Sequence, residues 1–401
     1  MKVLLVHNSY RQRGGEDSVF EQERSMLERA GHQLLIYRHS NSEIDSFSPL
    51  ARLLLPINTV WSSGARSELA AMLDTHSPDL VHVHNTFVLI SPSIYSVCRE
   101  KKVPVVQTLH NFRWLCPSAI FYRDGKVCED CVTGGLVNSV RHACYRGSKP
   151  ATAAIALALA THRHLGTFHD SIGTYITPSA FARDKFIASG FPAEKIVVKP
   201  NFVDPDPGPR DGVGAYALFA GRLSAEKGLY VLLRAWEMLS AHVPLQIIGD
   251  GPERHALEAF VRRRNIPNVT FRGALSRHDT FTAMKGARFV VVPSTVYETF
   301  GLVIAEAMAC GAPVLCSRLG AMQELVADHD TGLHFTAGDA HDLATKAAWA
   351  WNHPPEISVM GRTARREFEK RYTSRRNYAQ LMEIYDRALG RNLHAAAALA
   401  S

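Results

Sequence analysis

The sequence has no uncharged apolar run that approaches the roughly 18 residues needed to cross a bilayer. The closest stretch, residues 151–160, is rich in alanine and leucine, and histidine and arginine follow it. At the amino terminus only residues 3–6 form an apolar run, which is too short for the core of a signal peptide and is typical of a first buried strand. These absences predict a cytoplasmic protein, in which thiols normally stay reduced.

Charge is also sparse, because Asp, Glu, Lys and Arg make up only 21% of the 401 residues, against 46% hydrophobic residues. This balance fits a well-packed globular protein and argues against a disordered one. The net charge of +7 is modest, and residues 1–200 carry 22 Lys and Arg against 17 Asp and Glu. No basic run with interleaved aromatic residues is present, so nucleic-acid binding is not expected. A basic face that rests on anionic lipid remains an open alternative.

A chain of this length is expected to form two domains. Short apolar runs alternate with helix-like segments, which predicts an α/β protein with parallel sheets covered by helices. The predicted strands cover residues 3–6, 34–37, 80–83, 103–109, 174–177, 216–220, 245–248, 269–272, 289–292 and 313–316, and the last predicted helices cover 339–351, 356–371 and 374–389. The proline-rich stretch 199–209 is the predicted linker. Ligands of open α/β sheets bind beyond the carboxyl ends of the strands, so we expect the site in a cleft between the halves.

The first motif is FAGRLSAEKG at residues 219–228, where an apolar strand runs into Gly221 and Arg222, and Lys227 precedes Gly228 at a predicted helix start. Glycine lets the backbone approach a ligand closely, and a helix amino terminus presents free N–H groups to an anion. Arg222 and Lys227 could neutralise a diphosphate. A surface loop with solvated cations is the alternative interpretation.

The second motif places Glu298 in a strand-to-helix loop and Glu306 on the helix that follows, with Gly301 near the helix start. Eight residues of helix span about 12 Å, so the two glutamates are expected to contact different parts of an elongated ligand. Glu306 lies among apolar residues, where a lone carboxylate needs a partner such as ribose hydroxyls. An ordinary helix surface residue is the alternative.

Together the two motifs resemble the family 4 glycosyltransferases, which are retaining enzymes of the GT-B fold that use sugar nucleotides. GRLSAEKG is similar to the family's G-R-L-x-x-x-K-G loop, and Glu298 with Glu306 is similar to its E-x7-E signature. Further matches are KPNFVD, IIGDGPE and PSTVYETFGLVIAEAMACGAPV. The resemblance implies two Rossmann-like domains that face each other across a cleft. It divides the chain into an acceptor-binding domain (1–199), a nucleotide-sugar-binding domain (200–373), a helical segment that crosses back (374–395) and a flexible tail (396–401).

The resemblance also implies the role of each residue. Arg222 and Lys227 would hold the diphosphate and stabilise the charge of the leaving group, Glu298 would contact hydroxyls of the transferred sugar, and His110 would face that sugar. These four are the predicted catalytic residues, although a lone histidine at a strand end is more often structural. The predicted donor-binding residues are Gly14, Gly15, Gly221, Arg222, Lys227, Gly249, Arg272, Gly273, Glu298, Thr299, Phe300, Gly301, Leu302 and Glu306. His82 and His84, on one face of a buried strand, are predicted to be satisfied core residues.

The predicted reaction moves a sugar from a nucleotide diphosphate to a glycan or lipid-linked acceptor, in the synthesis of a cell-surface polysaccharide or glycolipid at the inner face of the membrane. We expect retention of configuration by front-face attack, because the first half offers no candidate for the nucleophilic carboxylate of a double displacement. No D-x-D metal motif is evident, so no catalytic metal is expected. A GT-B sugar-nucleotide epimerase and a non-catalytic sugar-nucleotide-binding protein are the alternatives. The base, the sugar and the acceptor are not specified.

Four of the seven cysteines, Cys116, Cys128, Cys131 and Cys144, crowd into a predicted insert at residues 111–148. One C-x2-C pair with two flanking cysteines could form a four-thiolate structural site for zinc or for an iron–sulfur cluster. Two disulfides or four free thiols are the alternatives. Some family 4 members contain a similar insert after an LHN motif, which in this sequence is Leu109, His110 and Asn111. The other three cysteines, Cys98, Cys310 and Cys316, are predicted to be small buried residues.

Overall fold

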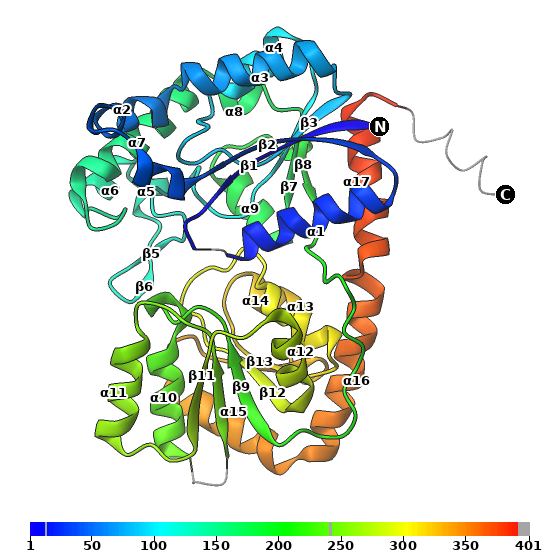
Figure 1. The fold of residues 1–401 in the computed structure, drawn as a ribbon. Coiled ribbons are helices and arrows are strands. Elements are labelled where there is room, and N and C mark those ends of the chain that lie inside the picture. The colour runs from blue at the N-terminus through cyan, green and yellow to red at the C-terminus, as the bar shows by residue number, and fades with distance from the viewer. Residues whose placement is uncertain (13, 240–242, 392–401) are drawn as a thin grey trace, which may run out of the picture. The chain divides into compact units, whose positions relative to one another are not determined.

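The computed structural model describes residues 1–12, 14–239 and 243–391, and its ribbon is drawn in Figure 1. The chain forms two compact units. The N-terminal unit comprises Met1–Phe121, Glu129–Pro200 and the chain from Asn377 onward, and the C-terminal unit comprises Tyr122–Cys128 and Asn201–Arg376. The predicted tail at 396–401 lies outside the described residues, as does the end of the predicted segment 374–395.

The N-terminal unit is built on a six-stranded sheet with the order β2-β1-β3-β4-β7-β8, in which every pair is parallel. The strands are β1 Lys2–Ser9, β2 Gln33–Ser40, β3 Leu80–Asn85, β4 Val105–Thr108, β7 Thr174–Thr177 and β8 Ile196–Val198. The α-helices are α1 Gly15–Arg29, α2 Pro49–Val60, α3 Ser63–His76, α4 Ile94–Glu100, α5 Asp130–Thr133, α6 Val137–Arg141, α7 Lys149–His164, α8 Thr167–Asp170, α9 Ala180–Ala188 and α17 Ser374–Ala388, and η1 Asn41–Ser46 and η2 Ala193–Lys195 are 3-10 helices. The central strands β1, β3 and β4 are almost wholly buried, as is usual in parallel sheets covered on both faces.

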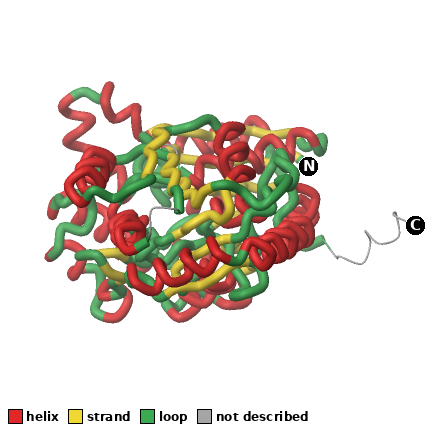
Figure 2. Tube along the Cα trace, turned by 90° about the horizontal axis from the view of Figure 1, so that it is seen from below, coloured by secondary structure: helices red, strands yellow, loops and turns green. Residues whose placement is uncertain are grey.

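The C-terminal unit repeats this plan with the sheet order β11-β10-β9-β12-β13-β14, again parallel throughout. Its strands are β9 Tyr216–Ala220, β10 Leu245–Ile248, β11 Val269–Gly273, β12 Ala287–Val292, β13 Val314–Ser317 and β14 Gly332–Phe335. Its helices are the 3-10 helix η3 Ala225–Lys227 and the α-helices α10 Leu229–Met238, α11 Arg254–Arg264, α12 Arg277–Gly286, α13 Leu302–Ala309, α14 Ala321–Leu325, α15 Ala340–Asn352 and α16 Pro354–Arg371. Figure 2 colours these strands yellow and the helices red. The core includes Trp236, whose indole N–H donates to the Val243 carbonyl at 3.0 Å.

The predicted α/β architecture of two Rossmann-like domains is confirmed, and every predicted strand coincides with an observed one. Strands β8 and β14 were not predicted. Both are edge strands of three or four residues, so each pairs on one side only and gives a weak apolar signal.

The predicted cysteine insert contains a short hairpin, β5 Tyr122–Arg123 with β6 Lys126–Val127. Its two loop residues, Asp124 and Gly125, have φ values of 52° and 82°, which is the left-handed geometry of tight hairpin turns. Residues 122–128 are grouped with the C-terminal unit, whereas the prediction placed the whole insert in the first domain. A two-stranded hairpin has no core of its own, so sequence continuity does not fix which body it joins.

Candidate active site

Three glycine-containing loops meet at the carboxyl ends of β9, β10 and β12 in the C-terminal unit. The Gly221 N–H donates to the Ile248 carbonyl at 3.0 Å, and a Cβ on Gly249 would lie 1.8 Å from the Gly221 oxygen. A Cβ on Gly228, which has φ +71°, would lie 1.9 Å from the Pro293 oxygen. Larger residues at 228 and 249 would therefore push the loops apart.

Lys227 and Glu298 form an ion pair between two of these loops. The Lys227 Nζ lies 2.6 Å from the Glu298 Oε1, which also accepts a hydrogen bond from the Ser294 hydroxyl at 2.8 Å. Burial lowers the pKa of Lys227, but the attraction of Glu298 outweighs it and the net shift is upward. Burial raises the pKa of Glu298, but Lys227 and Ser294 outweigh it and the net shift is downward. Both groups are therefore charged near neutral pH.

Arg222 is the exposed cation of the same loop, and its charge opposes that of Lys227 by lowering the lysine pKa. In the part of the chain that the structure describes, no side chain or carbonyl pairs with its guanidinium. An unpaired guanidinium beside a second cation can form bidentate hydrogen bonds with an anionic ligand such as a phosphate.

The residues after Glu298 form the amino terminus of α13. Gly301 has φ +84° and precedes Leu302, the first residue of the helix, so Thr299–Leu302 lie at a helix start, where backbone N–H groups can bind an anion. Phe300 is buried against Tyr372 with ring centroids 5.7 Å apart, which anchors this loop to the body of the unit.

Glu306 lies on α13, apart from the Lys227–Glu298 pair. Burial raises its pKa to about 7, against the opposing attraction of Arg277. Three of the predicted donor-binding residues, Gly249, Arg272 and Gly273, lie on the other side of the sheet's centre, where the Gly249 N–H donates to the Gly273 carbonyl at 2.8 Å. The exposed Arg272 donates to the Gln246 side chain at 2.9 Å.

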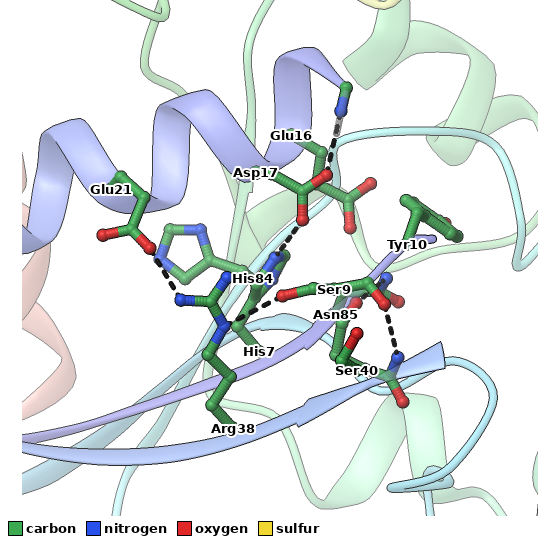
Figure 3. A network of polar contacts seen from close by, with 12 residues as sticks. His7, Ser9, Tyr10, Glu16, Asp17, Glu21, Arg38, Ser40, His84 and Asn85 are labelled. Atoms are coloured by element: carbon green, nitrogen blue, oxygen red, sulfur yellow. Dashed lines mark hydrogen bonds and ion pairs between the residues drawn. The ribbon is translucent and has the colours of Figure 1, made fainter. Parts of the chain in front are cut away.

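In the N-terminal unit, β1 ends at Ser9, Gly14 is the N-cap of α1 and Gly15 is the first residue of that helix. The Gly14 N–H donates to the Asp17 Oδ2 at 2.9 Å, and the Asp17 Oδ1 lies 2.9 Å from the His7 Nε2 (Figure 3). His7 and Asp17 are buried, so this contact ties the glycine loop to the central strand. The start of α1 is thereby fixed near the carboxyl end of β1.

His110, which is half-buried, follows β4 and contacts the buried His84, with 2.9 Å between its Nε2 and the His84 Nδ1. Burial holds the pKa of both rings well below the ordinary value, and Lys199 adds to this effect. Both imidazoles are therefore neutral near neutral pH. His82 is a satisfied core residue, as predicted, because its ring nitrogens bond Tyr385 and Thr108 at 2.7 and 2.8 Å.

Glu16 is a feature that the sequence interpretation missed. Its carboxyl accepts a hydrogen bond from the Asn111 amide at 2.8 Å, while its Oε1 is shielded from solvent without a hydrogen-bond partner among the described residues. Burial, with repulsion from Asp17, raises its pKa to about 8. The available signal was a carboxylate directly after the two glycines of the first strand–helix loop. Figure 3 shows Glu16 beside Asp17.

Glu16→Gln is expected to change how the stability of the protein depends on pH. The folded state raises this pKa from 4.5 to about 8, so it binds the proton more tightly than the unfolded chain and loses stability as pH rises through this window. Glutamine cannot ionise, so the melting temperature of the variant relative to the parent should increase across the window. Glu28→Gln, on the exposed end of the same helix, is the control. A Glu16→Gln difference that is constant with pH would contradict the assignment.

A second missed feature is a buried ion pair between Glu23 on α1 and Lys199, with 3.0 Å between the Glu23 Oε1 and the Lys199 Nζ. Both side chains are at most 2% exposed. Glu23, His82 and His84 form the one group of the described residues in which three potential metal ligands lie within 4.8 Å of one another. Lys199 places a positive charge on that carboxylate, and both nitrogens of His82 are already bonded, so these residues fit an ion pair and do not fit a metal site.

The predicted four-thiolate site stays a prediction, because no three of its thiols lie within 4.8 Å of one another among the described residues. Cys116 and Cys131 are buried, and a hydrogen bond from the Cys131 side chain lowers the pKa of Cys116 to about 5. Cys116, Cys131 and Cys144 are not among the described groups that could share a metal, and Cys128 lies in the segment grouped with the other unit. The other three cysteines are fully buried, as predicted.

Comparisons with known proteins match both units. The model of "Glycosyltransferase Family 4" matches residues 13–207, and that of "Glycosyl transferases group 1" matches residues 214–353. An uncharacterized glycosyltransferase of Methanocaldococcus jannaschii is 29% identical over 43% of this chain and 48% of its own. A D-inositol 3-phosphate glycosyltransferase of Saccharomonospora viridis is 33% identical over 43% of this chain and 42% of its own.

The matched region thus spans less than half the length of these curated relatives. Among solved structures, Anabaena HepE in complex with UDP is similar in fold, with a TM-score of 0.68 and 18% identity over 96% of this chain and 99% of its own. No helix among the described residues combines the length and the apolar character that a membrane span requires.

Proposed function

Because the chain belongs to glycosyltransferase family 4, we propose that it transfers a hexose-type sugar from a nucleotide diphosphate to a glycan or lipid-linked acceptor, with retention of configuration. The observation that carries this proposal is the Lys227–Glu298 pair beside the unpaired guanidinium of Arg222. These three residues lie at the carboxyl ends of the adjacent parallel strands β9 and β12, where ligands of such sheets bind. The two cations suit a diphosphate, and the carboxylate suits the hydroxyls of a sugar.

In the proposed mechanism the C-terminal unit binds the donor. Arg222 and Lys227 bind the diphosphate and stabilise the charge that develops when the bond to the anomeric carbon breaks. Glu298 accepts hydrogen bonds from sugar hydroxyls, and the N–H groups at Thr299–Leu302 bind the distal phosphate. The ribose contacts Glu306, and the base lies near Gly249, Arg272 and Gly273. UDP is the first nucleotide to test, because the similar structure of HepE holds it.

The acceptor is proposed to bind the predicted acceptor domain, residues 1–199, near the loop of Gly14 and Gly15. The neutral imidazole of His110 would accept or donate a hydrogen bond to the transferred sugar. The acceptor hydroxyl attacks from the face that the phosphate leaves, and the departing phosphate oxygen takes its proton, so this step needs no protein nucleophile. Paired cations supply the charge that a metal ion would otherwise supply, so no catalytic metal is proposed. Lipid-linked acceptors would place the enzyme at the inner face of the membrane.

The test is release of the nucleotide from a panel of UDP-, GDP- and ADP-sugars, with and without glycan or lipid-linked acceptors. Arg222→Ala is expected to lower transfer by about 100-fold, because it removes a charged donor from the leaving phosphate. Its melting temperature should equal that of the parent, since the side chain is exposed. Arg262→Ala, an exposed arginine of α11, is the matched control and should retain full activity.

Turnover of no donor would overturn the proposal. Conversion of the sugar nucleotide without any acceptor would identify an epimerase instead. Tight nucleotide binding with no turnover would identify a non-catalytic binding protein. Nuclear magnetic resonance of the product distinguishes retention from inversion.

A further inference from the structure

Exposed apolar side chains are concentrated on one group of packed helices in the N-terminal unit. Eleven large apolar side chains of the described residues are exposed, and eight of them lie on α2, α6 or α7 or directly after one of these helices. They are Leu50, Leu53, Leu54, Ile57, Trp61, Val137, Leu157 and Leu165. We name these eight residues the apolar face.

Helix α2 contributes most of the apolar face. Thr59 is its one buried residue, and Leu53 is 74% exposed. Residues 50, 53, 54, 57 and 61 follow the spacing of one helical stripe. The helix packs along α7, which also contacts α6, and the three lie together in Figure 1. The stripe therefore lies on a helix packed against α7, which carries the exposed Leu157 and is followed by Leu165.

The sequence segments that form the apolar face carry charged side chains of one sign. Residues 46–67 and 131–169, which contain the three helices, have no Asp or Glu. The same two segments carry six cationic side chains, Arg52, Arg66, Arg141, Arg146, Lys149 and Arg163. The helices of the apolar face and their flanking residues thus supply six cations to a chain with a net charge of only +7, and one of the six, Arg66, also pairs with Glu100 at 3.2 Å.

We propose that the apolar face docks on the surface of an anionic lipid bilayer, with α2 lying in the plane of the headgroups. The 12 residues of α2 span about 18 Å, which is too short to cross the bilayer and suits an interfacial helix. Apolar side chains enter the acyl boundary while the surrounding cations pair with lipid phosphates. Trp61, at the end of α2, is a residue type that favours this interface.

A second copy of the chain is a poorer occupant, because it would place six cations against six cations. This inference adds a membrane-docking surface to the proposed function, and it rests on that function for the lipid-linked acceptor. It does not depend on the donor chemistry, since the apolar face belongs to the N-terminal unit and the donor residues to the other.

The test is co-sedimentation with vesicles of phosphatidylcholine alone and of phosphatidylcholine mixed with phosphatidylglycerol. The parent should bind the mixed vesicles at least about tenfold more tightly than the neutral ones, and added salt should weaken this binding. A double variant, Leu53→Ser with Ile57→Ser, should lose at least about tenfold in affinity. It replaces two exposed apolar side chains, which leave water when the parent docks, by polar ones. Val359→Ser removes an exposed apolar residue of α16 and should bind as the parent does.

Equal binding of the parent and the double variant to mixed vesicles would overturn the inference, as would equal binding of the parent to both vesicle types. A lipid-independent dimer of the parent that the double variant abolishes would assign the face to a second copy and would also overturn it. The thermal shift caused by UDP is measured on the same proteins. If the double variant keeps this shift and releases nucleotide in solution while losing vesicle binding, donor chemistry and docking are separated. If UDP causes no thermal shift in the parent, that result would count against the proposed function and not against the docking of the apolar face.

Discussion

Lys227→Met is expected to lower the rate of sugar transfer by about 1000-fold, at the upper end of what loss of one charge-stabilising donor costs. The substitution removes a cation from the diphosphate and also leaves Glu298 without the partner that holds it at 2.6 Å. The pKa of Glu298 should rise, because the attraction of Lys227 is what outweighs burial in the parent. The effects are measured as kcat/KM for the donor and as acid-induced unfolding.

The sign of the pH effect follows from the downward shift at Glu298. A carboxyl with a depressed pKa in the folded state stabilises the protein above its ordinary pKa of 4.5, and this contribution disappears as pH falls through the folded value. Lys227→Met should therefore bring the onset of acid unfolding to a higher pH.

A double-variant cycle separates the two roles of this pair. Glu298→Gln removes the charge that Lys227→Met leaves unpaired, so the double variant should be more stable than Lys227→Met alone and still inactive. Recovery of both stability and activity would mean that the pair is structural. Lys227→Arg keeps the charge on a different shape and should retain partial activity.

The parallel sheets were predictable because strands buried on both faces read as uninterrupted apolar runs, and β9 and β10 begin and end at the predicted residues. The donor side of the site was predictable for a related reason. Arg222, Lys227 and Glu298 follow β9 and β12, which are neighbours in the sheet, so their loops share one edge. The direct contact of Lys227 with Glu298 was not predicted, since spacing specifies a loop and does not specify a rotamer.

The cysteine interpretation shows where residue spacing is insufficient. Between Cys116 and Cys128 the backbone takes positive φ values at Ala119, Phe121 and Asp124, none of which is a glycine. The chain therefore changes direction several times over a stretch that the spacing treats as a simple loop. The number of residues between two thiols does not by itself determine which of them meet, and the four-thiolate site stays a prediction.

Lys199→Met is expected to be the most destabilising single substitution considered, at about 3–5 kcal/mol, because it leaves the Glu23 carboxylate buried without its cation. Lys199 also donates to Asn377 at 3.0 Å, and Asn377 donates to the Pro200 carbonyl at 2.7 Å, so the same change weakens the attachment of α17. The loss is measured as the opening free energy of β3 and α17 amides by native-state hydrogen exchange. Lys101→Met breaks a surface pair with Asp74 in the same unit and should cost at most about 1 kcal/mol.

Adding Glu23→Gln to Lys199→Met distinguishes a buried charge from lost packing. If the unpaired carboxylate is the cause, the double variant should recover most of the lost stability, because neither charge then remains in the interior. If packing of the lysine stem is the cause, Glu23→Gln should recover none of it. Equal losses for Lys199→Met and Lys101→Met would contradict the assignment of a buried ion pair. Recovery in β3 without recovery in α17 would assign the residual loss to the hydrogen bond with Asn377.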